Sequence, residues 1–95
     1  MTNDPITHRE AEVAQYDANI ALYKSILADL PTEWPARLEQ YRGRTDQQTA
    51  VAEVADLDDV ELLAKLLYAD QVRAAIRAET LERTKAASIL AALKK

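Results

Sequence analysis

Few side chains in this sequence have the chemistry that enzymatic catalysis requires. His8 is the only histidine, and Ser25 and Ser88 are the only serines. A serine nucleophile needs a histidine base within hydrogen-bond reach, and neither serine stands in the glycine-flanked turn that exposes such a nucleophile. The lack of cysteine also removes thiolate chemistry. We therefore expect His8 to be a surface histidine and the chain not to be an enzyme.

Four acidic residues stand close together before and within the start of an expected helix: Asp56, Asp58, Asp59 and Glu61. Calcium and magnesium ions bind where several such oxygens converge, and an EF-hand loop also needs a glycine that is missing here. Helix capping and the helix dipole already explain acidic residues at this place. A single histidine without cysteine does not suit zinc. We expect no metal ion and no cofactor.

A third group combines arginine with aromatic residues between positions 34 and 44. Its members are Trp34, Arg37, Tyr41, Arg42 and Arg44. Such a set can stack on nucleic-acid bases and grip the backbone, or it can form a hot spot for a protein partner. It can equally be ordinary surface. It is not a glycine-rich phosphate loop.

The composition indicates an all-α protein. Of the 95 residues, 48% are hydrophobic, mostly Ala and Leu, with one Gly and no Phe. Ala and Leu favour helices, whereas turns and strand corners usually need Gly. The net charge of −4 disfavours nucleic acid as the main partner. No apolar run approaches the roughly 20 residues of a membrane span, and no signal-peptide pattern opens the chain. We expect a cytoplasmic protein without a membrane contact.

Local signals divide the chain into four helices within a single domain, residues 1–95. Thr7 and Glu10 form a capping box, and Pro31 ends the helix that follows. Pro35 suits the first turn of a second helix, and Gly43 suits its left-handed C-terminal cap.

Two further capping boxes mark the later helices. Thr45 and Gln48 form the first, and Asp58 and Glu61 form the second. The expected organisation is a flexible lead followed by four helices: residues 1–6, then about 8–30, 35–42, 46–56 and 59–93. Leu57 and Leu62 are expected to form a hydrophobic staple around the last N-terminus.

The most regular pattern lies on the first helix. Its apolar residues recur at alternating spacings of three and four, the a/d pattern of a coiled coil. They are Val13, Tyr16, Ile20, Tyr23, Leu27 and Leu30. Such a seam needs a long partner helix, and only the helix at 59–93 is long enough. We predict a small helical bundle in which two long helices pack along this seam and two short helices cover one end.

The last helix is too long for a compact domain of this size. It would measure roughly 50 Å, whereas a 95-residue domain has a radius of gyration of about 12–13 Å. If it overhangs, its apolar residues face water, and self-association would bury them. The alternative is that the first helix folds back along the overhang. The residues concerned are Leu81, Ile89, Leu90 and Leu93.

Charge divides the second half of the chain. Residues 53–70 hold six acidic residues against one lysine, and residues 73–95 hold six basic residues against two acidic ones. An antiparallel pair of such helices would place opposite charges together, which favours a two-fold homodimer. Each end could instead simply complement its own helix dipole.

These observations favour a non-enzymatic protein–protein interaction module, such as an adaptor or an assembly subunit. Its partner is expected to be a second copy of the chain or another protein. The alternative is a nucleic-acid-associated regulator that uses Arg73, Arg77 and Arg83. The expected contact residues are Leu81, Ile89, Leu90 and Leu93, with Trp34, Tyr41, Arg42 and Arg44 as a second surface.

Overall fold

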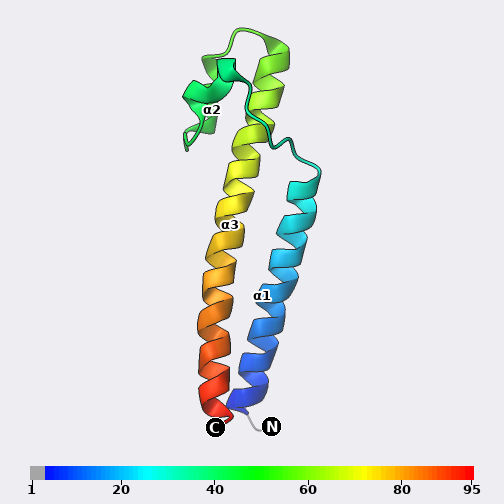
Figure 1. Ribbon diagram of the computed structural model, residues 1–95, viewed down its shortest axis with the longest axis vertical. Coiled ribbons are helices and arrows are strands. Elements are labelled where there is room, and N and C mark those ends of the chain that lie inside the picture. Colours follow the sequence, from blue (N-terminus) through cyan, green and yellow to red (C-terminus); the bar gives the residue numbers. More distant parts are fainter. Residues whose placement is uncertain (1–3) are drawn as a thin grey trace.

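The computed structural model describes residues 4–95, and within them every regular element is helical. The chain forms helix α1 (Pro5–Ala28), the short 3-10 helix η1 (Ala36–Tyr41), helix α2 (Gln47–Ala52) and helix α3 (Leu57–Leu93). The two long helices, α1 and α3, pack against each other (Figure 1). The predicted all-α architecture, with two long and two short helices, is confirmed.

α1 and α3 run antiparallel, so both chain ends lie at the same end of the molecule (Figure 1). The molecule measures 59 × 22 × 19 Å, with a radius of gyration of 18.6 Å. A compact domain of this length would have about 12–13 Å, so the protein is a rod. α3 is one continuous helix of 37 residues. Within it, the Thr80 hydroxyl donates a hydrogen bond to the carbonyl of Ile76 at 2.7 Å without interrupting the helix.

The start of α1 differs from the prediction. The helix begins at Pro5 rather than near residue 8, and Asp4 rather than Thr7 is its cap. The Asp4 carboxylate accepts hydrogen bonds from the Ile6 amide at 3.0 Å and from the Thr7 hydroxyl at 3.2 Å. Asp4 outcompetes Thr7 because Pro5 is already preset for the first helical position. Of the lead expected at 1–6, residues 1–3 lie outside the described residues, and residues 5–6 are helical.

The other boundaries also shift. The expected helix at 35–42 is the 3-10 helix η1, and Gly43 follows it with φ +84°. The expected helix at 46–56 shortens to α2, because the chain turns at Glu53 and Val54 then packs against the core. α3 starts at Leu57, capped by Asp56, whose carboxylate accepts from the Asp58 amide at 2.9 Å. Leu57 is 83% exposed, so the predicted staple with Leu62 is wrong.

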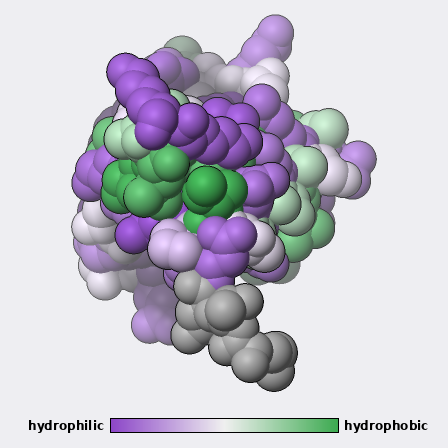
Figure 2. All heavy atoms as spheres, turned by 90° about the horizontal axis from the view of Figure 1, so that it is seen from below, coloured by the Kyte–Doolittle hydropathy of each residue, from purple (hydrophilic) through white to green (hydrophobic). Residues whose placement is uncertain are grey.

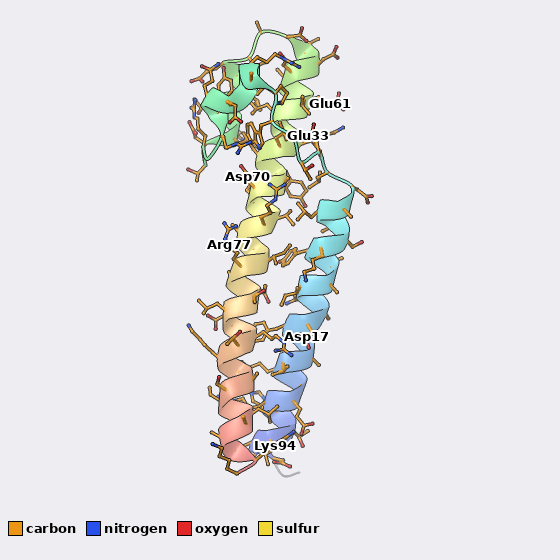
Figure 3. All side chains as sticks on the ribbon, in the orientation of Figure 1. Asp17, Glu33, Glu61, Asp70, Arg77 and Lys94 are labelled. Atoms are coloured by element: carbon orange, nitrogen blue, oxygen red, sulfur yellow. The ribbon has the colours of Figure 1, made fainter. Side chains whose placement is uncertain are left out.

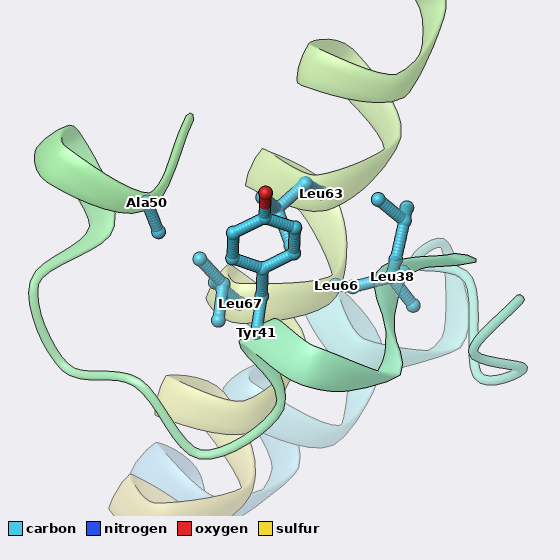
Figure 4. Packing of buried hydrophobic residues seen from close by; sticks show 6 residues of the cluster. All are labelled: Leu38, Tyr41, Ala50, Leu63, Leu66 and Leu67. Atoms are coloured by element: carbon cyan, nitrogen blue, oxygen red, sulfur yellow. The ribbon is translucent and has the colours of Figure 1, made fainter. Parts of the chain in front are cut away.

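One end of the rod contains a packed core. η1 and α2 lie across the first turns of α3 and enclose a cluster of buried side chains (Figure 4). Half-buried Trp34, Val51, Val54 and Leu62 pack around it. We call residues 34–67 the head. Its buried cluster consists of Leu38, Tyr41, Ala50, Leu63, Leu66 and Leu67.

The remainder of the rod is thinner. We call α1 together with residues 69–93 of α3 the stem. The stem has only two helices side by side, and α1 has no buried residue. On the α3 side, only Ala69, Val72 and Ala86 are buried. Every residue of the predicted seam on the first helix is half-buried, including Leu30 just beyond the helix end. The seam therefore forms as predicted, but two helices cannot cover it from all sides.

Candidate interaction surfaces

The position of α1 changes the expectation about an overhang. α1 lies along the second half of α3 and covers one side of it. The chain therefore adopts the alternative arrangement, in which the first helix folds back along the last one. α1 covers only one side of α3. Leu81 remains 55% exposed on the other side, and Leu22 of α1 is 59% exposed. The stem therefore exposes less apolar surface than an uncovered helix would, but Leu81 and Leu22 still face water.

The end of the stem that carries both termini has three of the four contact residues predicted on the last helix. Ile89 is 42% exposed and Leu93 is 41% exposed, whereas Leu90 is half-buried. Ile6 at the start of α1 is also half-buried. Figure 2 looks onto this end and shows hydrophobic residues gathered between charged ones. This apolar end consists of Ile6, Ile89, Leu90 and Leu93, while Leu81 lies farther up α3.

Polar contacts cross the middle of the stem. Arg83 donates to Asp17 at 2.6 Å, and the Asn19 amide donates to Glu79 at 3.2 Å. Partial burial, followed by nearby carboxylates of Glu12, Glu82 and Glu79, raises the pKa of Tyr16. Polar groups placed on a helix seam fix its register but contribute less than apolar packing.

The second predicted surface belongs to the head. The Arg42 guanidinium lies 5.3 Å from the centre of the Trp34 ring, and that of Arg44 lies 5.9 Å from the centre of the Tyr41 ring. Both distances allow a cation–π contact. Trp34 is half-buried and Arg42 exposed, whereas Tyr41 is only 9% exposed and serves the core. Tyr41 is therefore a support for Arg44 rather than an accessible contact residue.

Ion pairs hold the arginines of the head in place. Arg44 donates to Asp46 at 2.9 Å and to Glu53 at 2.7 Å, and these hydrogen bonds raise its pKa and lower that of Asp46. Arg37 of η1 binds Asp59 of α3 through three hydrogen bonds of 2.8–3.0 Å, which lower the pKa of Asp59. A bidentate pair of this kind fixes orientation as well as charge.

A cavity that the sequence analysis missed lies where the head meets the stem. The turn after η1 and the outer face of α3 enclose about 370 Å³. The positions on α3 recur at helical spacing, which is the only signal of it in the sequence. Its floor and rim consist of Gly43, Arg44, Thr45, Leu67, Asp70, Gln71, Arg73, Ala74 and Arg77.

Within the described residues, the side chains considered for catalysis are not joined to one another by hydrogen bonds. His8, Ser25 and Ser88 are all exposed, and no hydrogen bond among residues 4–95 joins the histidine to either serine. The same residues contain no group of three potential ligands that could hold a metal ion. Neither long helix in this part of the chain has the sustained apolar stretch that crossing a bilayer requires.

The fold and its surfaces define an elongated all-α helical hairpin with a small packed head. The chain matches no protein-family model, no curated protein and no solved structure at a significant level.

Proposed function

We propose that this protein is a non-enzymatic interaction module that associates with a second copy of itself through the stem. The observation that carries the proposal is the lack of any buried residue on α1, a helix of 24 residues with a regular apolar seam. A helix with this pattern normally buries its seam against more than one neighbour. A second hairpin would supply the missing neighbours and convert two half-covered helices into a four-helix bundle.

The apolar end supports the same proposal. Ile89 and Leu93 are both more than two-fifths exposed and lie on the same helix within about one turn. A cluster of this kind at the end of a helix pair is a normal feature of a protein contact. Charge agrees with it, because residues 4–29, which comprise α1 and its two cap residues, contain five acidic and two basic residues, whereas residues 73–95 are basic overall. Association of α1 with a partner's α3 would therefore be attractive.

Binding of nucleic acid by the stem has less support. Arg83 is engaged with Asp17, and Arg73 with Asp70 at 2.8 Å. Of the three arginines on which this alternative rests, only Arg77 has no carboxylate partner among residues 4–95. Phosphate binding needs several uncompensated cations along one face.

The test is the molar mass in solution, measured by light scattering after size exclusion over a concentration series. We expect the wild-type chain to have a dimer mass and the double variant Ile89→Glu/Leu93→Glu to have a monomer mass, because two carboxylates would then have to enter an apolar contact.

Leu57→Glu is the matched control for this experiment. It introduces the same side chain in place of a more exposed leucine at the opposite end of the rod. Its mass should equal that of the wild type. A monomeric wild type at the highest concentration, or equal masses for the double variant and the wild type, would contradict association through the apolar end.

A further inference from the structure

We propose that the cavity between the head and the stem binds an acidic segment of a partner protein, with an apolar side chain on the cavity floor and a neighbouring carboxylate on Arg77. This site lies on the outer face of α3, far from the apolar end near the chain termini. It would give the module a second, different contact in addition to self-association.

The cavity has an apolar floor and an open mouth. Leu67 and Ala74 form the floor, and both lie on α3 two helical turns apart. At the mouth, Gly43, Thr45 and Gln71 are exposed. A volume of about 370 Å³ lies at the lower end of the range that ligand pockets occupy. This shape suits one side chain on a polypeptide that crosses the mouth better than a fully enclosed small molecule.

The walls of the cavity are held by contacts within the protein. Gln71 of α3 donates a hydrogen bond to Gln47 of α2 at 3.2 Å. Arg44 is held by its two carboxylate partners and by the Tyr41 ring beneath it. A wall that is fixed before binding lowers the entropy cost of binding.

The charges at the cavity select an acidic partner. Asp70 pairs with Arg73 at 2.8 Å, and Arg44 pairs with Asp46 and Glu53. Arg77 is exposed and has no carboxylate partner among the described residues. Asp70 and Arg77 project from α3 toward the side that carries α2 (Figure 3). Arg77 is therefore the one arginine of the cavity lining that is not already paired with a carboxylate, and a guanidinium is well suited to bind one.

The experiment uses the single glycine as a reporter. Gly43 lines the cavity and is the only glycine, so protein labelled with ¹⁵N-glycine gives one backbone amide signal from the site. The probe is the blocked peptide Glu-Asp-Leu-Asp-Glu. We expect a saturable shift of the Gly43 signal that weakens as salt is added. Two comparison peptides separate the contributions: Gln-Asn-Leu-Asn-Gln lacks the charge, and Glu-Asp-Gly-Asp-Glu lacks the apolar side chain. Both should bind more weakly.

Three variants of α3 complete the test. Arg77→Gln should weaken binding of the acidic peptide by about tenfold, because it removes a charge-assisted hydrogen bond. Lys85→Gln removes one positive charge from an exposed lysine of the same helix outside the cavity, and it should leave binding unchanged. Ala74→Glu, at an exposed position on the floor, should abolish binding without unfolding the helix.

Three results would overturn the proposal. They are the lack of a saturable shift with the acidic peptide, equal binding of either comparison peptide, and equal weakening by Lys85→Gln and Arg77→Gln. None of them depends on the oligomeric state, so self-association and peptide binding fail or succeed separately.

Discussion

The head and the stem of this molecule use the same kinds of residues to different effect. In the head, three helical elements meet, and Leu38, Leu63, Leu66 and Leu67 are at most 2% exposed. In the stem, two helices meet, and no residue of α1 is buried. Two cylinders in contact can shield only the line between them, whereas a third element closes the groove that they leave. Burial here therefore depends on how many helical elements meet, and not on how regular the apolar seam is.

The polar contacts between helices also differ between the head and the stem. The ion pair of Arg37 with Asp59 joins η1 to α3 beside a packed core. In the stem, the contacts of Asn19 with Glu79 and of Asp17 with Arg83 lie across the interface itself. Of these side chains, half-buried Asn19 and Glu79 take up places that apolar residues would occupy in a closed bundle. The stem is thus an interface that one chain only partly completes.

The largest expected effect comes from shortening one apolar side chain in each region. Leu63→Ala should lower the free energy of unfolding by about 2–5 kcal/mol, because Leu63 is fully buried and its removal leaves a cavity. Ile20→Ala in the half-buried seam should cost less than about 2 kcal/mol. Urea denaturation followed by circular dichroism measures both. Equal losses for the two variants would remove the distinction between head and stem.

The next largest effect is expected from making the interface between the two stem helices as apolar as the core of the head. Replacing both polar partners, as Asn19→Leu/Glu79→Leu, should raise the free energy of unfolding by about 1–2 kcal/mol, because half-buried apolar area replaces a polar pair. The change should also strengthen self-association. Urea midpoints at matched protein concentration measure the first effect. A less stable double variant would show that the polar pair is essential to the stem.

The smallest effect concerns pH and is confined to the head. Hydrogen bonds from Arg37 lower the pKa of Asp59 below its ordinary value of 3.8, and those from Arg44 do the same for Asp46. A carboxyl group whose pKa is lowered by folding stabilises the protein above its unfolded pKa. This stability is lost as the pH falls below about 3.8 toward the folded pKa.

Asp59→Asn tests this expectation. Thermal melting between pH 2 and 6 should show a shallower acid loss of stability in the variant than in the wild type. Asp17→Asn in the stem is the comparison, because the pair of Asp17 with Arg83 is exposed on both sides. If both variants changed the loss of stability at low pH equally, the ion pair of the head would contribute no more to stability than the exposed pair of the stem.

Much of the fold could be predicted from the pattern of residues, because helix signals are local. The seam from Val13 to Leu30 and the single Gly43 predicted the long first helix and the break after η1. The first cap could have been predicted, since Asp4 stands directly before Pro5, a residue suited to the first helical position, but the capping box of Thr7 and Glu10 competed with this signal. The position of α1 along α3 depends on tertiary packing, so the sequence left both arrangements open.

The surfaces were less predictable than the fold. Leu81, Ile89 and Leu93 are exposed as expected of contact residues, whereas Tyr41 proved to be part of the core. The cavity beside Ala74 was missed because three of its nine lining residues belong to a turn whose place depends on contacts remote in sequence, such as Gln47 with Gln71.

The central claim is that the stem is completed by a second copy, and amide hydrogen exchange tests it most directly. Exchange is measured on the wild type, on Ile89→Glu/Leu93→Glu and on Leu57→Glu at the same concentration. We predict that only the double variant loses protection along α1 and residues 69–93, while protection of the head stays equal in all three proteins. Equal protection of α1 in the wild type and the double variant would contradict the account, because the stem would then be complete in a single chain.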